Sequence, residues 1–405
     1  MRPYRILLAL DKFKGTLSSR EAALVLEQGL REGLGARLRE HNCEIQNTDL
    51  HNIDIKIWPV SDGGQGLLEA LRQPLQLVFK PVWVSTPHGT WTQAQLGWQP
   101  TQQRVVIESS QTTGLHLIPP ELRHPLQLNS AGLGAFLQAA AALDPQEILI
   151  GLGSSGTVDG GMGLAQALGY GLWDAAGQPL PALPVHARQL ARITLPETPV
   201  FHPDHPPRII GLCDVNNPVL GAEGGVRVYG PQKGATAAEL DELETAMAHW
   251  AKRLVLDLAL PTSAEALLTC PGAGAAGGLG MGLKALLGAE LQSGAQWLFS
   301  VSGLEQALQA ADLLITGEGQ FDQQSGFGKW PAYVIEAAQK KNLPVVLVTG
   351  QRIQGPVPKG LLQSYALVDF EPMAAESPSL SQVAMIQVGR MIAEKIDTGN
   401  QRSWF

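Results

Sequence analysis

Cysteine is scarce in this chain of 405 residues, which contains only Cys43, Cys213 and Cys270. Three widely spaced cysteines do not make a disulfide framework, and they lack the spacing of a zinc site. Charged residues are also few, at 16%, and acidic residues outnumber basic ones to give a net charge of −8. Because a protein of this charge has no basic field to attract nucleic acid, we expect no nucleic-acid partner.

Long apolar runs are missing as well. The run Ile6–Leu10 near the amino terminus is too short for a signal peptide or a membrane span. The longer apolar stretch from Ala131 to Leu143 is broken by Asp144-Pro145. We therefore expect a cytoplasmic protein without a membrane partner, whose oligomeric state the sequence does not predict.

Several familiar catalytic signatures are absent too. The chain has no G-x-x-x-x-G-K-[ST] phosphate loop and neither the H-R-D nor the D-F-G signature of protein kinases. It has no H-E-x-x-H zinc motif, and Ser154 and Ser155 lack the G-x-S-x-G context of a serine nucleophile. A nucleotide would therefore have to bind in a less familiar way.

What the sequence does contain in quantity is apolar residues, at 44%, and glycine, with 45 residues. Its length and composition favour two or more globular domains with full cores. Strand-like runs alternate with helical patterns at both ends of the chain, which predicts parallel α/β sheet. In the middle, Leu77–Val84, Trp91–Trp98 and Arg104–Glu108 are typical of consecutive strands joined by turns, so we expect antiparallel pairing there.

We therefore predict an α/β protein of two domains. Residues 1–75 plus 285–405 are expected to form one discontinuous domain, and residues 76–284 an inserted mixed α/β domain. Two segments are predicted to lack regular structure, the polar insertion 40–52 and the proline-rich stretch Pro179–Pro207. Capping boxes predict helix starts at Ser18 with Glu21 and at Thr236 with Glu239.

The loop after the apolar run Ile148–Ile150 carries the most informative pattern. It contains three glycines with the G-x-G-x-x-G spacing of dinucleotide-binding loops, Gly151, Gly153 and Gly156. Asp174 lies near where a ribose-binding carboxylate would be expected. However, the loop continues past the third glycine to Asp159, and a carboxylate so close to a pyrophosphate needs a metal or cation between them. The loop is therefore more typical of phosphoryl transfer, and an NAD-dependent oxidoreductase is the alternative.

Carboxylates also follow or end most of the predicted strands, beside glycines or small hydroxyl residues. They are Asp11, Asp62, Asp159, Asp214, Glu318 and Asp322. Because ligands of open α/β sheets bind beyond the carboxyl ends of the strands, this shared position predicts a ligand site. The alternative for any one of them is a helix N-cap, but the glycines beside the whole set favour ligand binding.

Lysines near predicted helix starts add a second signal, and they are Lys12, Lys14, Lys233 and Lys329. An ammonium group beside helix N–H groups could hold a phosphate or a carboxylate, although each lysine could instead only solvate a loop. The glycine run 271–282 is open to two interpretations in the same way, an anion-binding nest or close packing of a helix on a strand. We favour the nest, because the run leads into a predicted helix over Leu283–Leu287.

Taken together, these motifs resemble those of the type I glycerate kinase family, bacterial enzymes that phosphorylate glycerate with ATP. The matching segments, in the order in which the family has them, are Asp11–Ser18, Pro59–Gly64, Gly151–Gly163, Cys213–Pro218, Gly230–Ala235, Pro271–Gly278 and Ile315–Asp322 with Gly328-Lys329. The resemblance implies a flavodoxin-like domain built from both chain ends, an inserted domain and an active site in the cleft between them. It also implies ATP as co-substrate, Mg²⁺ as cofactor and phosphorylation of D-glycerate at the 2-position.

From the residues and the resemblance together we predict two sets of site residues. The catalytic set is Asp62, Asp159, Asp322 and Lys14, of which Asp159 and Asp322 are also candidate metal ligands. The substrate- or nucleotide-binding set is Asp11, Lys12, Gly63, Gly64, Ser154, Ser155, Gly156, Asp214, Asn216, Lys233, Gly277, Gly278, Glu318 and Lys329. Which carboxylate acts as base and which binds metal stays open.

The chain departs from the family pattern at a few positions. Gln65 stands where the family usually has Glu, Val158 where it has Asn, and Gln320-Phe321 where it has Arg-Ile. Losing an arginine at position 320 removes a candidate clamp for a carboxylate or phosphate. Besides the oxidoreductase, a non-catalytic metabolite-binding relative of the kinases is therefore a third alternative.

Overall fold

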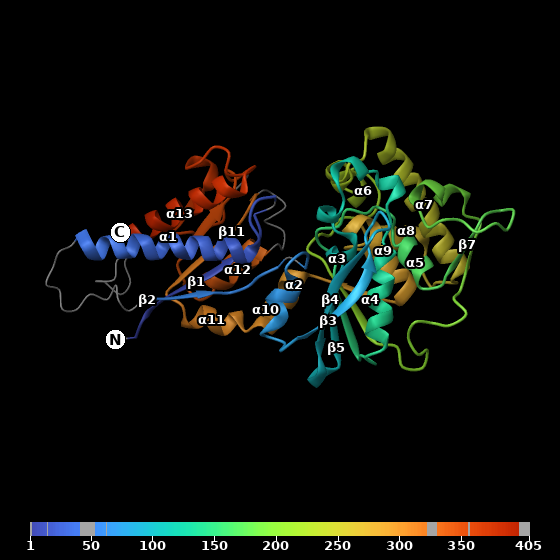
Figure 1. Cartoon of the computed structure of the whole chain (residues 1–405), viewed down its shortest axis with the longest axis horizontal. Coiled ribbons are helices and arrows are strands. Elements are labelled where there is room, and N and C mark those ends of the chain that lie inside the picture. Colours follow the sequence, from blue (N-terminus) through green and yellow to red (C-terminus); the bar gives the residue numbers. More distant parts are fainter. Residues whose placement is uncertain are drawn as a thin grey trace. The chain divides into compact units, whose positions relative to one another are not determined.

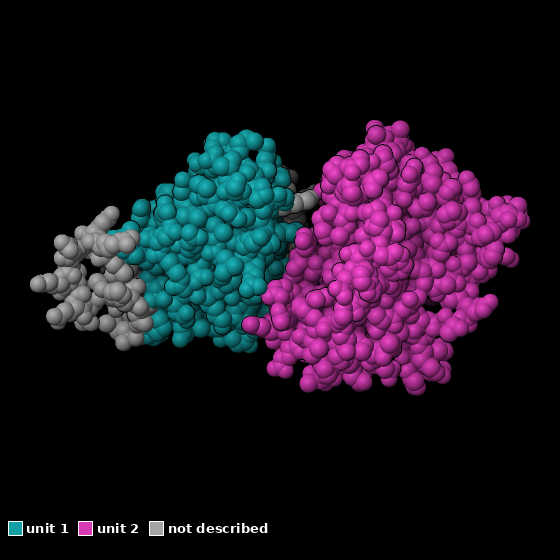
Figure 2. Space-filling view, viewed as in Figure 1, with its two compact units in different colours: residues 1–61, 298–405 teal, residues 62–297 magenta. Residues whose placement is uncertain are grey.

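A computed structural model describes residues 2–13, 15–40, 53–61, 63–321, 330–354 and 357–396. The chain forms two compact units (Figure 2): unit 1 comprises Met1–Ser61 and Leu298–Phe405, and unit 2 comprises Asp62–Trp297. The sequence places the corresponding boundaries at 75/76 and 284/285. Within the described ranges, every helix is too short or too polar to cross a lipid bilayer.

Unit 1 contains a five-stranded sheet in which every neighbouring pair is parallel. Its strands are β1 (Tyr4–Leu10), β2 (Ile53–Ile57), β11 (Leu313–Glu318), β12 (Val345–Thr349) and β13 (Gln363–Ala366). Their order across the sheet is β2-β1-β11-β12-β13, so the strands contributed by the two chain ends meet where β1 pairs with β11. This is the flavodoxin-like order, and the predicted α/β class is confirmed.

Helices cover both faces of this sheet (Figure 1). Helices α1 (Ser19–Glu40) and α13 (Pro378–Lys395) lie side by side on one face, while α11 (Leu304–Ala310) and α12 (Trp330–Gln339) cover the other. The two faces follow from the alternation of side chains along β1, whose residues Ile6, Leu8 and Leu10 pack in the α1–α13 core. The predicted capping box at the start of α1 is confirmed, because Ser18 and Glu21 exchange hydrogen bonds.

Unit 2 contains a six-stranded mixed sheet with the order β10-β9-β6-β5-β4-β3. The strands are β3 (Val78–Ser85), β4 (Trp91–Gln99), β5 (Arg104–Glu108), β6 (Glu147–Gly151), β9 (Arg208–Leu212) and β10 (Glu290–Gln292). The predicted antiparallel pairing of the first three strands is confirmed. From β5 to β10 every pair is parallel, so four strands share one carboxyl edge.

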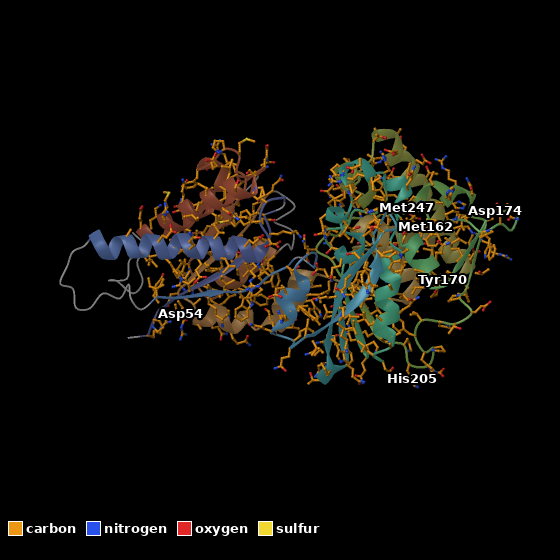
Figure 3. All side chains as sticks on the ribbon, in the orientation of Figure 1. Asp54, Met162, Tyr170, Asp174, His205 and Met247 are labelled. Carbon is orange, nitrogen blue, oxygen red and sulfur yellow. The ribbon has the colours of Figure 1, made fainter. Side chains whose placement is uncertain are left out.

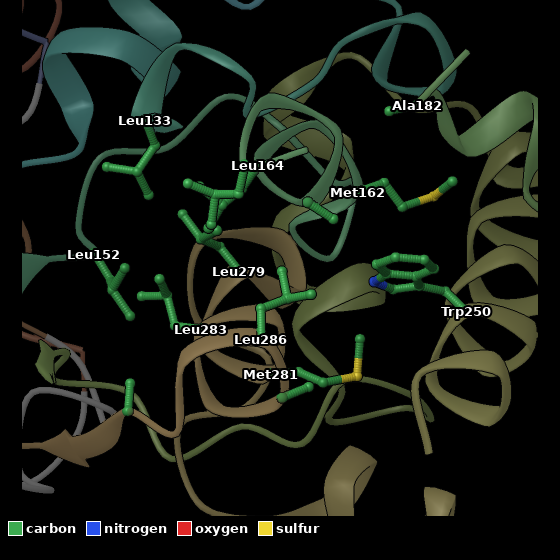
Figure 4. Packing of buried hydrophobic residues seen from close by; sticks show 14 of the residues in the cluster. Leu133, Leu152, Met162, Leu164, Ala182, Trp250, Leu279, Met281, Leu283 and Leu286 are labelled. Atoms are coloured by element: carbon green, nitrogen blue, oxygen red, sulfur yellow. The ribbon is translucent and has the colours of Figure 1, made fainter. Parts of the chain in front are cut away.

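The remaining elements of unit 2 surround a hydrophobic core that includes Met162, Leu279 and Met281 and the fully buried Trp250 (Figure 4). The helices are α2 (Leu67–Arg72), α3 (Ser110–Thr113), α4 (Gly132–Ala141), α5 (Met162–Ala167), α6 (Gly225–Tyr229), α7 (Ala237–Asp257), α8 (Ala264–Thr269), α9 (Ala275–Leu287) and α10 (Gly294–Ser302), the last of which continues into unit 1. A small hairpin pairs β7 (Gly171–Trp173) with β8 (Arg192–Thr194). Short 3-10 turns in the described part of unit 2 are η2 (Pro100–Gln102), η3 (Leu115–Leu117), η4 (Pro120–Leu122), η5 (Pro125–Gln127), η6 (Pro184–Gln189) and η7 (Pro231–Lys233), and unit 1 contains η8 (Leu367–Asp369).

Two local predictions for unit 2 are wrong and one is confirmed. The stretch Pro179–Pro207 is not irregular throughout, since it contains η6 and β8. The regular part of α9 begins at about Leu279 rather than Leu283, because residues 276–278 adopt left-handed conformations that form a kink inside the range Ala275–Leu287. The capping box of α7 forms as predicted between Thr236 and Glu239.

Charged side chains link the amino ends of the four parallel strands in unit 2. Glu147 of β6 accepts from Arg104 Nε of β5 at 2.5 Å and lies 3.4 Å from Arg208 Nη1 of β9. Arg208 in turn pairs with Glu290 of β10 at 2.6 Å. Glu147 pairs with two arginines and is only 16% exposed, so its loss removes two of these three ion pairs.

We expect Glu147→Gln to lower the free energy of unfolding of unit 2 by about 1 kcal/mol, equivalent to about 2–4 °C in Tm. The difference from wild type should shrink at high salt, which screens the lost charge pairs. The measurement is thermal unfolding at low and high ionic strength. Glu336→Gln, in an exposed pair with Lys340, is the control and should leave Tm unchanged; equal Tm for Glu147→Gln and wild type at low salt would contradict the role of the ladder.

Candidate active site

In unit 1, two predicted carboxylates lie at the ends of neighbouring strands. Asp11 follows β1 and Glu318 ends β11, and the residues before them, Leu10 and Gly317, are partners in the sheet register. Both side chains are buried. The Asp11 N–H donates to the Gly317 carbonyl oxygen at 2.8 Å, and the Lys12 N–H donates to Asp11 Oδ1 at 2.8 Å. The structure therefore brings Asp11, Lys12 and Glu318 together at one edge of this sheet.

This edge is the position at which flavodoxin-like sheets bind ligands. Their strand order reverses direction between the first and third strands in sequence, and ligands bind there, beyond the carboxyl ends. In unit 1 these strands are β1 and β11, the pair that carries Asp11 and Glu318. Gln320 follows shortly after in the same loop and is exposed.

In unit 2, three loops interlock over the carboxyl ends of the parallel strands, formed by residues 63–66, 109–115 and 151–157. The Gly153 N–H donates to the Gly63 carbonyl oxygen at 3.2 Å, which ties the first loop to the third. The Gly156 N–H donates to the Thr113 carbonyl oxygen at 2.6 Å, which ties the third loop to the second. The structure thus brings together the predicted residues Gly63, Gly64, Ser154, Ser155 and Gly156.

Hydroxyl groups are concentrated in this set of loops. Ser109, Ser110, Thr112, Thr113 and Thr157 are all fully buried. Ser109 Oγ donates to the Gly151 carbonyl oxygen at 2.6 Å. At least this hydroxyl therefore serves to hold two of the loops together. The sequence analysis did not predict the 109–113 hydroxyls, although their run directly after a predicted strand is a signal that could have found them.

Ser154 occupies an unusual backbone conformation within these loops. Its φ of +64° lies in the left-handed region, which costs a non-glycine residue on the order of 1 kcal/mol. Its carbonyl oxygen accepts a hydrogen bond from the Leu115 N–H at 3.1 Å. Its Oγ accepts one from the backbone N–H of Gln65 at 3.4 Å. Backbone strain of this kind is common at ligand-binding loops, which supports the predicted role of Ser154.

The geometry does not support the dinucleotide alternative. The helix after the fingerprint, α5, begins at Met162 and not at Gly156. A Cβ on Gly151 would overlap the Gly63 carbonyl oxygen, so this glycine is required by loop packing. Asp174 lies on the outer hairpin formed by β7 (Figure 3), outside the main sheet, and its carboxylate accepts from the N–H groups of Ala176 and Gln178.

Asp159 is completely buried, with four hydrogen bonds to its carboxylate. Oδ2 accepts from the Ser130 N–H and Oγ–H at 2.8 Å each and from the Gly163 N–H at 2.9 Å, and Oδ1 accepts from the Gly161 N–H at 3.3 Å. Burial raises the pKa of this carboxyl, while the hydrogen bonds oppose the shift. These contacts are those of a structural carboxylate that ties two loops together, and its predicted role in catalysis and metal binding stays a prediction.

Lys233 and the glycine run pack against the same segment of chain. Lys233 is buried, and its Nζ donates to the Thr157 carbonyl oxygen at 2.8 Å. A Cβ on Gly277 would overlap that same oxygen, and Gly278 lies against Gly160. These contacts are those of close packing, the less favoured interpretation from the sequence, and the predicted binding role of Gly277 and Gly278 stays a prediction.

Asp214 and its neighbours lie at the end of β9. Asp214 Oδ1 accepts from Ser293 Oγ at 2.9 Å and from the Ala295 N–H at 3.0 Å, so it caps helix α10, whereas Asn216 is exposed. Burial and the charge of Asp214 raise the pKa of Cys213 to about 12. The Cys213 thiol is therefore protonated at neutral pH and is not a nucleophile.

Four predicted residues, Lys14, Asp62, Asp322 and Lys329, lie outside the described residues, and their roles stay predictions. Among the residues that the structure describes, no group of three or more His, Cys, Asp or Glu side chains is arranged to hold a metal ion. Mg²⁺ commonly takes only one or two protein carboxylates, with phosphate and water completing its shell. Asp11 and Glu318 fit that requirement.

Glu108 is a buried carboxylate that the sequence analysis missed. It ends β5, and its Oε2 accepts from the Gly66 N–H at 3.1 Å, while its Oε1 accepts from Ser110 Oγ at 3.0 Å. Glu108 is the last residue of the predicted strand Arg104–Glu108, as Glu318 is the last residue of β11. Its position at the same sheet edge is the signal that could have found it.

A family model, curated relatives and a solved structure all relate this chain to glycerate kinases. The sequence model of the glycerate kinase family matches residues 6–394. A glycerate kinase of Halalkalibacterium halodurans is 35% identical over 355 residues, covering 86% of each chain, and a glycerate 2-kinase of Escherichia coli is 36% identical over 346 residues, covering 85% of each. A crystal structure of a candidate glycerate kinase 2 from Salmonella typhimurium has a TM-score of 0.70 and 31% identity, covering 96% of this chain and 97% of that one.

We expect Asp159→Asn to lower the free energy of unfolding by about 2–3 kcal/mol. In the variant, the NH₂ group of the amide would face N–H or O–H groups that now donate to the carboxylate, so these donors would lose their acceptor. The measurement is urea-induced unfolding, and Asp204→Asn on the exposed surface is the control. If the Asn variant unfolded like wild type but lost most of its kcat, the structural role would be contradicted and the catalytic prediction supported.

Proposed function

Because the chain belongs to the glycerate kinase family, we propose that it transfers the γ-phosphoryl group of ATP to the 2-hydroxyl of D-glycerate, giving 2-phosphoglycerate and ADP. That it is an enzyme that phosphorylates glycerate follows from the family, its named relatives and the structural neighbour. The family match from residue 6 to residue 394 is the observation that carries the proposal. The choice of ATP and of the 2-hydroxyl are the finer parts of the proposal.

Phosphoryl transfer leaves little covalent chemistry for the protein to do. The substrate hydroxyl oxygen attacks the γ-phosphorus, the bond to the β–γ bridging oxygen breaks, and ADP leaves as the hydroxyl proton passes to a base. Catalysis of such a transfer depends on positioning and on stabilising negative charge. Asp62, Asp159 and Asp322 are the candidates from the sequence for base or metal ligand, and Asp62 and Asp322 lie outside the described residues.

We assign the described residues supporting roles on this basis. Asp11 and Glu318, at the ends of β1 and β11, would hold Mg²⁺, which would neutralise phosphate charge. Lys12 lies beside them and would contribute a positive charge to an anionic ligand. In unit 2, the loops 63–66 and 151–157 offer glycine backbone and hydroxyl groups, which suit the phosphate or the hydroxy acid.

We expect ADP formation that depends on both ATP and D-glycerate. Adding enolase without a phosphoglycerate mutase identifies the product, because enolase acts on 2-phosphoglycerate and not on 3-phosphoglycerate. NAD reduction with hydroxy acids as substrates is the control for the oxidoreductase alternative. Stabilisation by glycerate or ATP without turnover would contradict the proposal and support a metabolite-binding protein instead.

We also expect the reaction to stop on chelation of divalent cations and to recover with Mg²⁺. Asp11→Asn and Glu318→Gln should each raise the Mg²⁺ concentration for half-maximal activity by about 10-fold or more. Calorimetric titration of Mg²⁺ into the enzyme with a non-hydrolysable ATP analogue measures the same change without turnover. Asp54→Asn, at an exposed position near the start of β2 (Figure 3), is the control; an unchanged Mg²⁺ requirement in both site variants would remove these carboxylates from the metal site.

A further inference from the structure

The chain passes between the two units twice. It enters unit 2 between Ser61 and Asp62 and leaves it between Trp297 and Leu298. A short helix lies next to each connection: α2 begins soon after the chain enters unit 2, and α10 contains the point where it leaves. On the unit 2 side, the amino end of each helix is held by a carboxylate from the sheet.

Glu108 holds the incoming connection. Helix α2 starts after Gly66, which has a φ of +93° and no side chain to serve as an N-cap. Glu108 supplies the missing cap from β5, with Oε2 accepting from Gly66 N–H at 3.1 Å and from Leu68 N–H at 3.4 Å. The carboxylate is 6% exposed, and Ser110 Oγ donates to its other oxygen.

Asp214 holds the outgoing connection in the same manner. Its carboxylate follows β9 and accepts from Ser293 Oγ and from the Ala295 N–H in the first turn of α10. The last residues of that helix belong to unit 1, where Phe299 lies edge-on against Tyr333 of α12 with ring centroids 5.1 Å apart. Helix α10 is therefore continuous from the turn that Asp214 caps in unit 2 to Phe299 in unit 1.

The two anchors flank the loop that the proposed reaction uses. In the sheet order, β6 lies directly between β9 and β5, so the loop 151–157 leaves the sheet between Asp214 and Glu108. Hydrogen bonds from N–H groups to an ionised carboxylate are stronger than neutral ones, and they are strengthened further by the positive end of a helix. Both connections are thereby fixed at the same edge of unit 2.

We propose that Glu108 and Asp214 are positioning residues for phosphoryl transfer, which clamp the incoming and outgoing connections of unit 2. The proposal rests on the proposed function, since it concerns the turnover of that reaction. Each carboxylate acts through backbone N–H groups and not through the reacting atoms. A loss of about 1 Å in positioning costs phosphoryl transfer and similar reactions about 100-fold in rate, so loosening either clamp should reduce turnover.

The test compares Glu108→Gln, Asp214→Asn and wild type by steady-state kinetics and by amide hydrogen exchange. Asp174→Asn is the matched control, because Asp174 also accepts from two backbone N–H groups but holds an outer hairpin. Exchange should rise over residues 63–72 in the Glu108 variant, over 293–302 in the Asp214 variant and over 174–180 in the control. Only the first two should lose kcat, by about 10-fold or more, with KM for glycerate and ATP changed much less.

Several results would overturn the proposal. Faster exchange at the expected segment with wild-type kcat would show that the clamp does not matter for turnover. A lower kcat without faster exchange would show that the carboxylate acts in another way. If either variant does not fold, Ser110→Ala and Ser293→Ala replace them, because each removes one hydrogen bond from a clamp. A wild-type kcat in both serine variants would overturn the proposal. Wild-type enzyme without glycerate-dependent turnover would overturn the proposed function itself, and this assignment with it.

Discussion

Direct contact between two stretches of backbone organises the site region of unit 2. Residues 157–161 lie against residues 277–282 so closely that a Cβ on Gly277 or Gly282 would overlap a carbonyl oxygen of the facing segment. With this contact in place, the carbonyl oxygens of 157 and 160 are satisfied by Lys233 Nζ and by Trp250 Nε1. The shape of the loop that follows β6 therefore depends on the absence of side chains at a few positions, which the hydrophobic core around Trp250 then holds in place.

The predictions that succeeded rest on local and periodic signals. Alternation and turns predicted the antiparallel strands, and the pairs Ser18–Glu21 and Thr236–Glu239 predicted two helix starts, because each depends on residues close in sequence. The break at residues 276–278 was missed because Ala276 adopts a left-handed conformation that a residue with a side chain rarely takes. The hairpin strand β8 was missed because it is only three residues long, too short to show an alternating pattern, and lies in a proline-rich stretch.

The prediction of the site residues was limited in the same way. The rule that ligand residues follow parallel strands placed Asp11 and Glu318 together correctly, because the sheet edge alone determines their position. It could not show that Asp159 is enclosed by hydrogen-bond donors, since sequence does not reveal whether a carboxylate meets solvent or is surrounded by N–H groups. The G-x-G-x-x-G spacing had a similar ambiguity: the packing of Gly151 against Gly63 requires glycine as strictly as a pyrophosphate would.

The strand order of unit 1 also constrains how the protein is made. Thr316 of β11 donates to the Ala9 carbonyl oxygen of β1, although 307 residues separate them. On the ribosome, β1 and β2 emerge first and then wait, for tens of seconds at ordinary elongation rates, until β11 is synthesised. The whole of unit 2 is contiguous and reaches completion during that interval. The apolar face of α1 stays uncovered for longer still, until α13 has been synthesised, so it is exposed surface on the nascent chain during that interval.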